Sequence, residues 1–255
     1  MSDRPPSHDF RKRLLARQHV LGTFIKIPTS HTIEIVGALG FDYVIVDAEH
    51  APYDRAAIDL ACLAARAANT AAIVRVQDEN AAAIMSALDC GAAGIMVPHC
   101  DSAEKARAVA AACRYRGGIR GFATTTRAGH WGGTAAEDHI AEQDAVTVCI
   151  AMIEDPAALE RLPAIAAVDG IDAFFIGRGD LGAALGPAGV KAATEQIAAA
   201  VRAAEKPVIA LVSSRDDARA MRDLGVSAFL HSNDQNLFKT AAAEALRDYS
   251  DPAAW

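Results

Sequence analysis

The feature that most constrains the fold of this chain is an alternation of two kinds of segment. A short run of β-branched and apolar residues is followed by a longer, alanine-rich segment with helical period, and the pair recurs about eight times. The predicted strands cover residues 21–27, 43–47, 72–76, 93–97, 146–153, 173–176, 208–211 and 228–230. The predicted helices cover residues 31–39, 54–68, 79–89, 102–113, 155–167, 190–204, 214–223 and 234–248. Strands that are apolar on both faces and alternate with helices indicate a parallel sheet covered by helices.

The number of repeats favours a closed barrel. About eight strand–helix repeats within 255 residues match the (β/α)8 TIM barrel, which is an α/β fold. We expect this barrel to form a single domain that covers residues 1–255. A doubly wound open sheet is the alternative. However, its glycine-rich phosphate-binding pattern is missing from the first predicted strand–helix turn, Pro28-Thr-Ser30.

Charge and composition exclude several classes of protein. The net charge is −7 and no basic cluster is present, which argues against nucleic acid or an anionic membrane as a partner. No apolar stretch approaches the roughly 20 residues of a membrane-spanning helix, and residues 1–10 do not resemble a secretion signal, so we expect a cytoplasmic protein. The five cysteines form no Cys-x-x-Cys pair, and we expect reduced thiols in or near the core.

A glycine- and arginine-rich segment, residues 114–144, interrupts the regular alternation and ends in a short helical piece. Long polar loops inside compact domains are usually functional or mobile. Because this segment follows the fourth predicted strand, we expect it on the C-terminal face of the barrel, where active sites lie. His130 in this segment could then approach a substrate.

Two carboxylates follow neighbouring predicted strands. Glu154 and Asp180 end the fifth and sixth strands, and adjacent parallel strands lie about 5 Å apart. Such a pair repels unless a cation bridges it or one member is protonated. Oxygen ligands suit Mg²⁺ or Mn²⁺, so this pair is a candidate metal site. The alternative is that both residues cap the helices that follow.

Three further polar residues end the second and third predicted strands. His50 follows Asp47 by three residues and is a candidate general base oriented by a neighbouring carboxylate. Arg75 ends an apolar strand, where a guanidinium is costly unless it meets an anion or an oxyanion. The alternatives are a histidine bonded to loop backbone, and a salt bridge from Arg75 to Asp47 or Glu49.

The order and spacing of several segments resemble the HpcH/HpaI-type class II pyruvate aldolases of the phosphoenolpyruvate/pyruvate barrel superfamily. The resemblance covers nearly the whole chain. It rests on the segments 40–54, Ile73-Val-Arg-Val76, 89–98, Arg114-Tyr115, Gly118-Ile-Arg-Gly121, Met152-Ile-Glu154 and 170–181.

The resemblance implies roles for residues already singled out. Glu154 and Asp180 match the metal ligands, with Mg²⁺ or Mn²⁺ expected and Co²⁺, Zn²⁺ or Ni²⁺ as alternatives. Arg75 matches the arginine beside the keto oxygen, and His50 with Asp47 matches the acid–base histidine and its carboxylate. The remaining matches are substrate-binding positions: backbone N–H groups at Gly179 and Asp180 for the carboxylate of the 2-oxo acid, and Phe24 and Leu211 near the aldehyde.

The resemblance also implies an activity and an assembly. We expect a metal-dependent aldolase, an aldehyde-lyase that cleaves or forms 4-hydroxy-2-oxo acids from pyruvate or hydroxypyruvate and an aldehyde through a metal-stabilised enolate. We also expect a homohexamer in which the C-terminal helix, residues 234–248, packs on a neighbouring subunit. The sequence departs from the family pattern at Ala48, Met152 and Gly177-Arg-Gly-Asp-Leu-Gly182. These departures leave the choice of oxo acid and aldehyde open.

Three alternatives remain open from the sequence. Lys26 shares strand parity with Phe24 and could form a Schiff base with the substrate, although pairing with a carboxylate is the simpler prediction. A metal-dependent acyl-CoA lyase of the related barrel family would need a basic surface at the barrel mouth, which Arg114, Arg116, Arg120 and Arg127 could supply. The third alternative is a catalytically silent barrel that binds 2-oxo acids.

Overall fold

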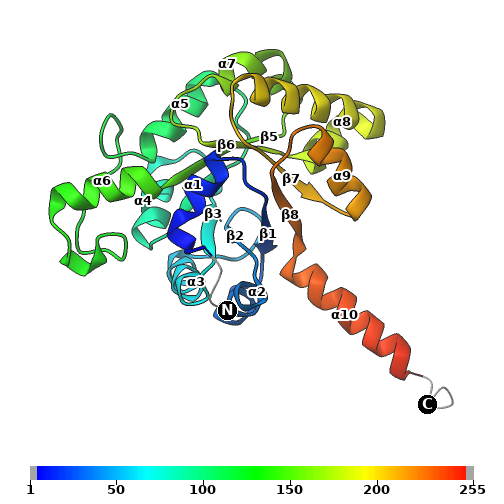
Figure 1. The fold of residues 1–255 in the computed structure, drawn as a ribbon, viewed down its shortest axis with the longest axis horizontal. Coiled ribbons are helices and arrows are strands. Elements are labelled where there is room, and N and C mark those ends of the chain that lie inside the picture. The colour runs from blue at the N-terminus through cyan, green and yellow to red at the C-terminus, as the bar shows by residue number, and fades with distance from the viewer. Residues whose placement is uncertain (1–4, 251–255) are drawn as a thin grey trace.

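A computed structural model of the chain describes residues 5–250 and consists of a closed parallel barrel (Figure 1). Each strand pairs in parallel with the next in the chain, and β1 pairs with β8, so the sheet closes on itself. The strands are β1 (Val20–Ile25), β2 (Tyr43–Asp47), β3 (Ala71–Arg75), β4 (Gly94–Val97), β5 (Val148–Ile153), β6 (Ala173–Ile176), β7 (Val208–Val212) and β8 (Ala228–Asn233). The predicted TIM barrel is therefore confirmed.

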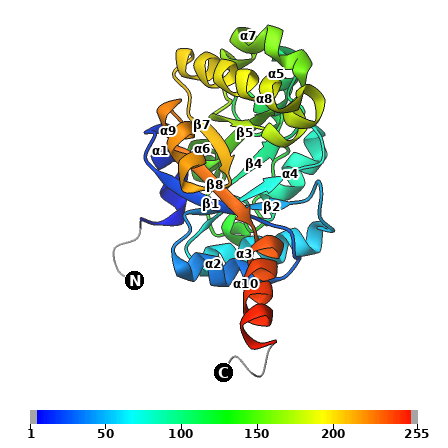
Figure 2. The same cartoon turned by 90° about the vertical axis from the view of Figure 1, so that its right-hand side faces the viewer.

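Helices surround the barrel and bury their apolar sides against the strands (Figures 1 and 2). They include α2 (Ser30–Leu39), α3 (Arg55–Ala67), α4 (Ala81–Asp89), α5 (Ala103–Ala112), α7 (Leu162–Ala166), α8 (Arg178–Ala203) and α9 (Arg215–Asp223). Two predicted helices differ from the helices that the structure shows. Residues 155–167 form a 3-10 segment, Pro156–Arg161, followed by α7, and α8 begins well before residue 190 and breaks at Gly186, where φ is 69°.

A short helix that the sequence did not predict closes the amino-terminal end of the barrel. Helix α1 (Phe10–Leu15) buries Phe10 and Leu14 among the side chains that fill the barrel interior. The ring of Phe10 lies 4.9 Å from that of Tyr43, measured between centroids. Ion pairs from Arg11 to Asp172 and from Arg13 to Asp42 hold the helix in place. The interior is therefore filled at this end.

The glycine-rich segment lies at the amino-terminal end of the barrel, so the prediction that it borders the active site is wrong. The chain has already crossed back along α5 before the segment begins, and its later part forms a 3-10 turn (His130–Gly132) and α6 (Ala136–Val146). Arg127 donates from Nε to the carbonyl oxygen of Cys90, just before β4. His130 pairs with Glu142, also on this face.

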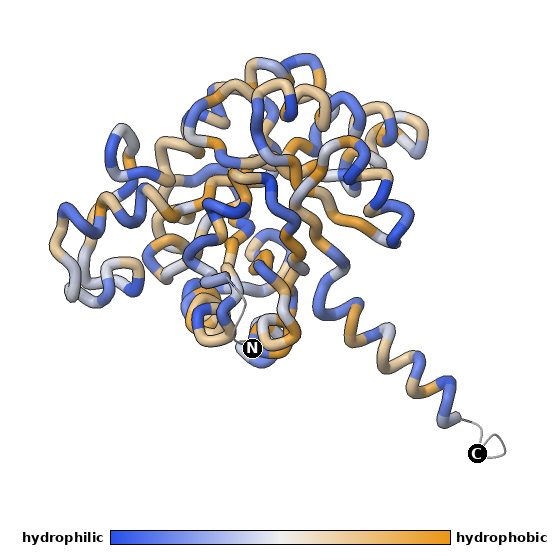
Figure 3. Tube along the Cα trace, viewed as in Figure 1, coloured by the Kyte–Doolittle hydropathy of each residue, from blue (hydrophilic) through white to orange (hydrophobic). Residues whose placement is uncertain are grey.

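The last helix leaves the barrel. Helix α10 (Asp234–Tyr249) begins at the end of β8 and projects outward, as both views show (Figures 1 and 2). Its first residue, Asp234, is buried and accepts hydrogen bonds from the backbone N–H groups of Lys26 and Ile27. Farther along, Phe238 is 73% exposed and Leu246 is 71% exposed. Apolar and hydrophilic stretches alternate along this helix (Figure 3).

One expectation from composition is confirmed. All five cysteines are buried and carry free thiols. None of the helices within residues 5–250 combines the length and the hydropathy that a bilayer span requires.

Candidate active site

The carboxyl ends of the strands surround an open cavity of about 670 Å³. Its walls bring together seven of the eight site residues predicted from the sequence, and the eighth, Asp47, is buried in direct contact with Arg75, which lines the cavity. The seven are Phe24, His50, Arg75, Glu154, Gly179, Asp180 and Leu211. The residues predicted from the strand ends therefore lie together around one cavity.

Asp47 organises the cations of the site. Its Oδ1 accepts from Nε of Arg75 at 2.9 Å, and its Oδ2 accepts from Nη2 of Arg75 at 2.7 Å. Nζ of Lys26 lies 3.0 Å from the same Oδ2. Burial alone would raise the pKa of Asp47, but the hydrogen bonds and charge of Arg75, together with those of His50 and Lys26, lower it overall. Asp47 is therefore an ionised, fully buried anchor.

Arg75 contacts Glu49 and Phe24 as well as Asp47. Its Nη1 lies 2.9 Å from Oε2 of Glu49, and its guanidinium carbon lies 5.1 Å from the ring centre of Phe24. The alternative of a salt bridge across the barrel mouth is confirmed, to Asp47 and Glu49 at once. Because Arg75 also lines the cavity, its fixed positive charge remains available to a bound anion.

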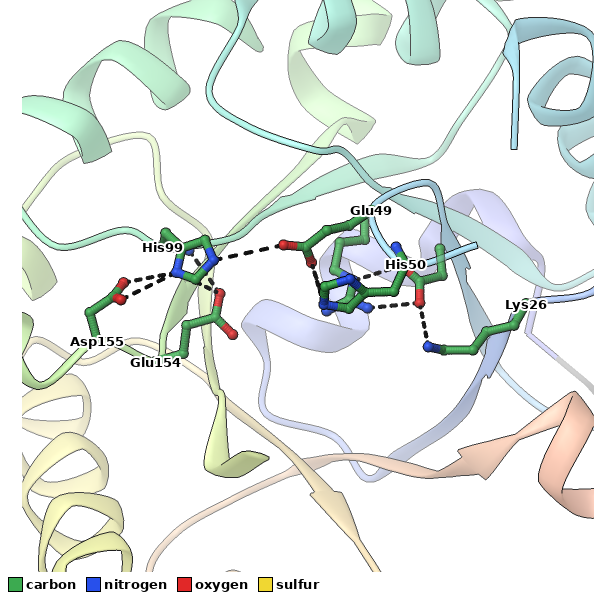
Figure 4. Close-up of polar contacts among 8 residues, drawn as sticks. Lys26, Glu49, His50, His99, Glu154 and Asp155 are labelled. Atoms are coloured by element: carbon green, nitrogen blue, oxygen red, sulfur yellow. Dashed lines mark hydrogen bonds and ion pairs between the residues drawn. The ribbon is translucent and has the colours of Figure 1, made fainter. Parts of the chain in front are cut away.

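His50 does not contact Asp47 in the predicted way. Its backbone N–H donates to Oδ1 of Asp47 at 3.1 Å, which fixes the turn after β2. The ring instead faces Glu49, with 3.7 Å between Nε2 and Oε2 (Figure 4). The side chain is 58% exposed and lines the cavity. Glu49, rather than Asp47, is thus the carboxylate beside the ring.

His99 belongs to the site and was missed from the sequence. Its ring lies between Glu49 and Asp155 (Figure 4), with Nδ1 3.1 Å from Oδ2 of Asp155. Burial opposes its charge, but Asp155, Glu154 and Glu49 raise the pKa of His99 overall. His99 directly follows Pro98 at the end of β4. Inspection of every strand end, rather than four of them, would have found it.

Glu154 is the most perturbed carboxylate of the cavity. Its Oε1 accepts from the backbone N–H of His99 at 2.8 Å, and the residue is only 3% exposed. Burial, together with the negative charges of Asp180 and Glu49, raises the pKa of Glu154 to about 7. Glu154 and Asp180 do not cap the helices that follow, since the N-cap residues are Asp155 and Gly177.

The surroundings of Glu154 and Asp180 fit a hard divalent cation. A Cβ on Gly177 would lie 2.7 Å from Oε2 of Glu154, so only glycine lets the loop after β6 approach this carboxylate so closely. Asp180, in the first turn of α8, lines the same cavity. Within residues 5–250 no cluster of three or more His, Cys, Asp or Glu forms a cage. Two carboxylates with room for water and substrate oxygens match the way proteins bind Mg²⁺.

The residues behind two alternative mechanisms have other contacts. Lys26 forms an ion pair with Asp47, as the simpler prediction held. The predicted basic surface at the barrel mouth is absent there, because its arginines lie on the opposite face. They pair with acidic residues: Arg114 with Asp172, Arg116 with Glu137, Arg120 with Asp89 and Arg127 with Asp59.

Arg178, a departure from the family pattern, fixes the neighbouring loop. Its Nη1 and Nη2 donate to the two carboxylate oxygens of Asp217 at 2.8 and 2.7 Å. It also donates to the carbonyl oxygen of Leu211, which lines the cavity. The backbone N–H of Ser213 donates to Asp217 as well. These contacts tie the end of β7 to the start of α8.

Comparison with known proteins agrees with this arrangement. The family model described as HpcH/HpaI aldolase/citrate lyase matches residues 21–239. A hydroxypyruvate/pyruvate aldolase of Cupriavidus necator is 33% identical, over 97% of this chain and 94% of the relative. A 5-keto-4-deoxy-D-glucarate aldolase of Klebsiella pneumoniae is 30% identical, over 91% of this chain and 93% of the relative.

Solved structures agree as well. An HpcH/HpaI aldolase/citrate lyase family protein from Burkholderia cenocepacia superimposes with a TM-score of 0.89 and 25% identity, covering 96% of this chain and all of that one. The citrate synthase SbnG gives a TM-score of 0.86 and 28% identity, covering 94% of this chain and 96% of that one. The chain thus belongs to the HpcH/HpaI aldolase/citrate lyase family.

Proposed function

We propose that this protein is a divalent-metal-dependent aldolase that cleaves or forms 4-hydroxy-2-oxo acids. The donor would be pyruvate or hydroxypyruvate and the acceptor an aldehyde. The observation that carries the proposal is the convergence on one cavity of Glu154, Asp180 and an Arg75 fixed by Asp47. The relative named hydroxypyruvate/pyruvate aldolase supports the choice of donor.

The donor carboxylate would bind at the start of α8. Backbone N–H groups in the first turn of a helix have no acceptor within the helix and favour an anion. The N-cap, Gly177, makes no side-chain cap, and Gly179 and Asp180 line the cavity. The carboxylate would therefore accept hydrogen bonds from the backbone of Gly179 and Asp180. This position brings the neighbouring keto group toward Glu154 and Arg75.

Glu154 and Asp180 would hold the cation, which would supply Lewis-acid stabilisation of the negative charge that develops when C3–C4 breaks. Arg75 donates to the keto oxygen, an interaction that strengthens as this oxygen becomes negative. Asp47 and Glu49 keep the guanidinium in place, so little reorganisation is needed during the reaction. In cleavage His50 would accept the proton of the C4 hydroxyl as C3–C4 breaks and then assist protonation of the enolate at C3; in synthesis it would assist removal of a C3 proton and protonate the oxygen of the aldehyde.

The test is pyruvate release from a short 4-hydroxy-2-oxo acid. The protein is assayed after chelation, after Mg²⁺ or Mn²⁺ is added back, and after borohydride treatment in the presence of substrate. Loss of activity on chelation and recovery with metal is the expected result. Activity that survives chelation but is abolished by borohydride would transfer the chemistry to Lys26 and overturn the proposal.

We also propose that the protein is a homo-oligomer, a hexamer by family resemblance, in which α10 packs on a neighbouring subunit. Helix α10 exposes Phe238, Leu246 and Tyr249, and it projects away from its own barrel (Figure 2). Apolar side chains on an unpartnered helix mark an interaction surface. A second copy of this chain is the partner that a symmetric assembly provides.

A further inference from the structure

Strand β8 ends in a bulge beside the cavity. Gly22 pairs with Leu230 and Phe24 pairs with Asn233, so β8 advances by three residues while β1 advances by two. Ser232, within this bulge, has a φ of 60°, which is uncommon for a residue other than glycine. Bulges redirect side chains and are frequent next to active sites, and strained backbone clusters at such sites. The bulge is therefore a reason to examine what its side chains face.

The bulge and the first turn of α10 present open polar atoms to the cavity, which His231, Ser232 and Asn236 all line. Nδ1 of His231 lies 3.1 Å from the carbonyl oxygen of Val212. A carbonyl oxygen only accepts, so Nδ1 carries a hydrogen, and in the neutral imidazole Nε2 is then an acceptor. Within residues 5–250, Nε2 of His231, Oγ of Ser232 and the amide of Asn236 have no protein hydrogen-bond partner. We name these three residues the polar rim.

The charged side chains next to the polar rim are paired. Arg178, on the neighbouring wall, is bound by both oxygens of Asp217. Asp234 is bound by backbone N–H groups, and Lys26 is paired with Asp47. Leu211 and Phe24 supply apolar surface to the same cavity. A ligand at the polar rim thus meets neutral donors and acceptors beside an apolar wall.

Resting on the proposed aldolase function, we propose that the polar rim binds the hydroxyl groups of the acceptor aldehyde. The preferred acceptor is then a neutral, hydroxylated aldehyde rather than an apolar or an anionic one. Nε2 of His231 accepts from a substrate hydroxyl, and the amide of Asn236 and the hydroxyl of Ser232 donate to or accept from its neighbours. A site built to hydrogen-bond a substrate hydroxyl discriminates strongly against analogues that lack it.

The test compares three aldehydes of two carbons each: glycolaldehyde, acetaldehyde and glyoxylate. With pyruvate as donor and Mg²⁺ or Mn²⁺ present, kcat/KM is measured for each. We expect glycolaldehyde to exceed both others by about tenfold or more. His231→Leu should reduce the glycolaldehyde-to-acetaldehyde ratio by about tenfold, while His231→Gln, which keeps an acceptor, should retain most of it. Asn236→Ala should reduce the ratio as a second, independent variant.

His130→Leu is the matched control, because His130 lies on the opposite face of the barrel. An unchanged ratio in both His231→Leu and Asn236→Ala would overturn the inference, as would a wild-type preference for acetaldehyde or glyoxylate. Exchange of the C3 protons of pyruvate in D₂O reports on the donor half alone. If exchange occurs but the expected aldehyde selectivity is absent, only the proposed role of the polar rim is rejected. Absence of both exchange and product with every aldehyde rejects the aldolase function and, with it, this inference.

Discussion

Asp47 binds the guanidinium of Arg75 through both of its carboxylate oxygens, at 2.9 Å from Nε and 2.7 Å from Nη2. A planar fork held in this way keeps its direction as well as its charge. An ammonium group on a flexible stem would keep only the charge. A substitution of Arg75 by lysine therefore tests the contribution of the fixed orientation separately from the contribution of the positive charge.

Arg75→Lys should retain the fold and lose most of the activity. We expect kcat for cleavage of a 4-hydroxy-2-oxo acid to fall by about 10²-fold or more, the usual cost of removing a positioned donor to a developing oxyanion. Steady-state kinetics with circular dichroism checks this. Arg13→Lys is the control, because Arg13 pairs with Asp42 at the other end of the barrel. Near-normal kcat in Arg75→Lys would remove Arg75 from the reaction.

His50→Gln should lower kcat by about 10²- to 10⁴-fold, the range typical of a lost general base. The matched control is His31→Gln, since His31 is an exposed histidine that bonds to Thr29 and does not line the cavity. The measurement is pyruvate release at saturating substrate. Equal rates in the two variants would show that His50 transfers no proton.

Glu154→Gln should change how the free energy of unfolding depends on pH. Burial raises the pKa of Glu154 to about 7, against roughly 4.3 in an unfolded chain. The metal-free wild-type protein then binds an extra proton between these values, and its stability falls as pH rises through this window. At pH 8 metal-free Glu154→Gln should be more stable than wild type, by about 1–3 kcal/mol.

Urea unfolding between pH 5 and 8, with a chelator and then with Mn²⁺, checks this prediction. Mn²⁺ should raise the midpoint of the wild type and leave that of Glu154→Gln nearly unchanged, because one of the two proposed ligands is lost. Equal stabilisation of both proteins by Mn²⁺ would place the cation elsewhere.

Asp217→Asn should weaken the loop after β7 in a pH-dependent way. Hydrogen bonds from Arg178 lower the pKa of Asp217 to about 2. A lowered pKa stabilises the folded state fully above the unfolded value near 3.9, and this contribution is lost as pH falls toward 2. Wild type should therefore exceed Asp217→Asn in stability by roughly 1 kcal/mol at pH 7, with the difference shrinking below pH 4.

Asp216→Asn is the control for this experiment. Asp216 is the neighbouring residue, and its side chain is 88% exposed in an ion pair with Arg219. Thermal unfolding at pH 7 and pH 3 should detect no comparable change. A pH-independent difference between wild type and Asp217→Asn would indicate that packing, rather than the ion pair, holds the loop.

Phe238→Glu should reduce the size of the assembly by placing a charge within the proposed interface of α10. Thr240→Glu adds the same charge at a different angle around this helix and should leave the assembly intact. Light scattering after size-exclusion chromatography gives the mass of each particle. Wild type eluting as a monomer would reject the oligomer outright.

The barrel was predictable because each strand is an apolar run bounded by helix signals, and every predicted strand lies within a few residues of an observed one. Helix α1 was not predictable from periodicity, since six residues are too few to establish a period. Its apolar residues, Phe10 and Leu14, are buried only because they pack against the interior of the folded barrel.

The members of the site were predictable from their positions at strand ends, but their partners were not. Asp47 and His50 are three residues apart, which suggested a direct side-chain contact. The register of β2 and β3 instead places Asp47 opposite Arg75, so the carboxylate meets the guanidinium. His99 was overlooked, and Glu49 was considered only as a partner of Arg75, because the contacts between these two residues depend on loops that approach each other only in the folded barrel.

The pairing of β1 with β8 also has a consequence for how the chain is made. These two strands are about 200 residues apart in sequence, and closing such a long loop costs entropy before any contact repays it. A ribosome that has released β1 through β7 has produced an open sheet with two unpaired edges, which are templates for aggregation. The barrel becomes a closed ring only once residues 228–233 have emerged, so we expect nascent chains that stop before β8 to depend on chaperones.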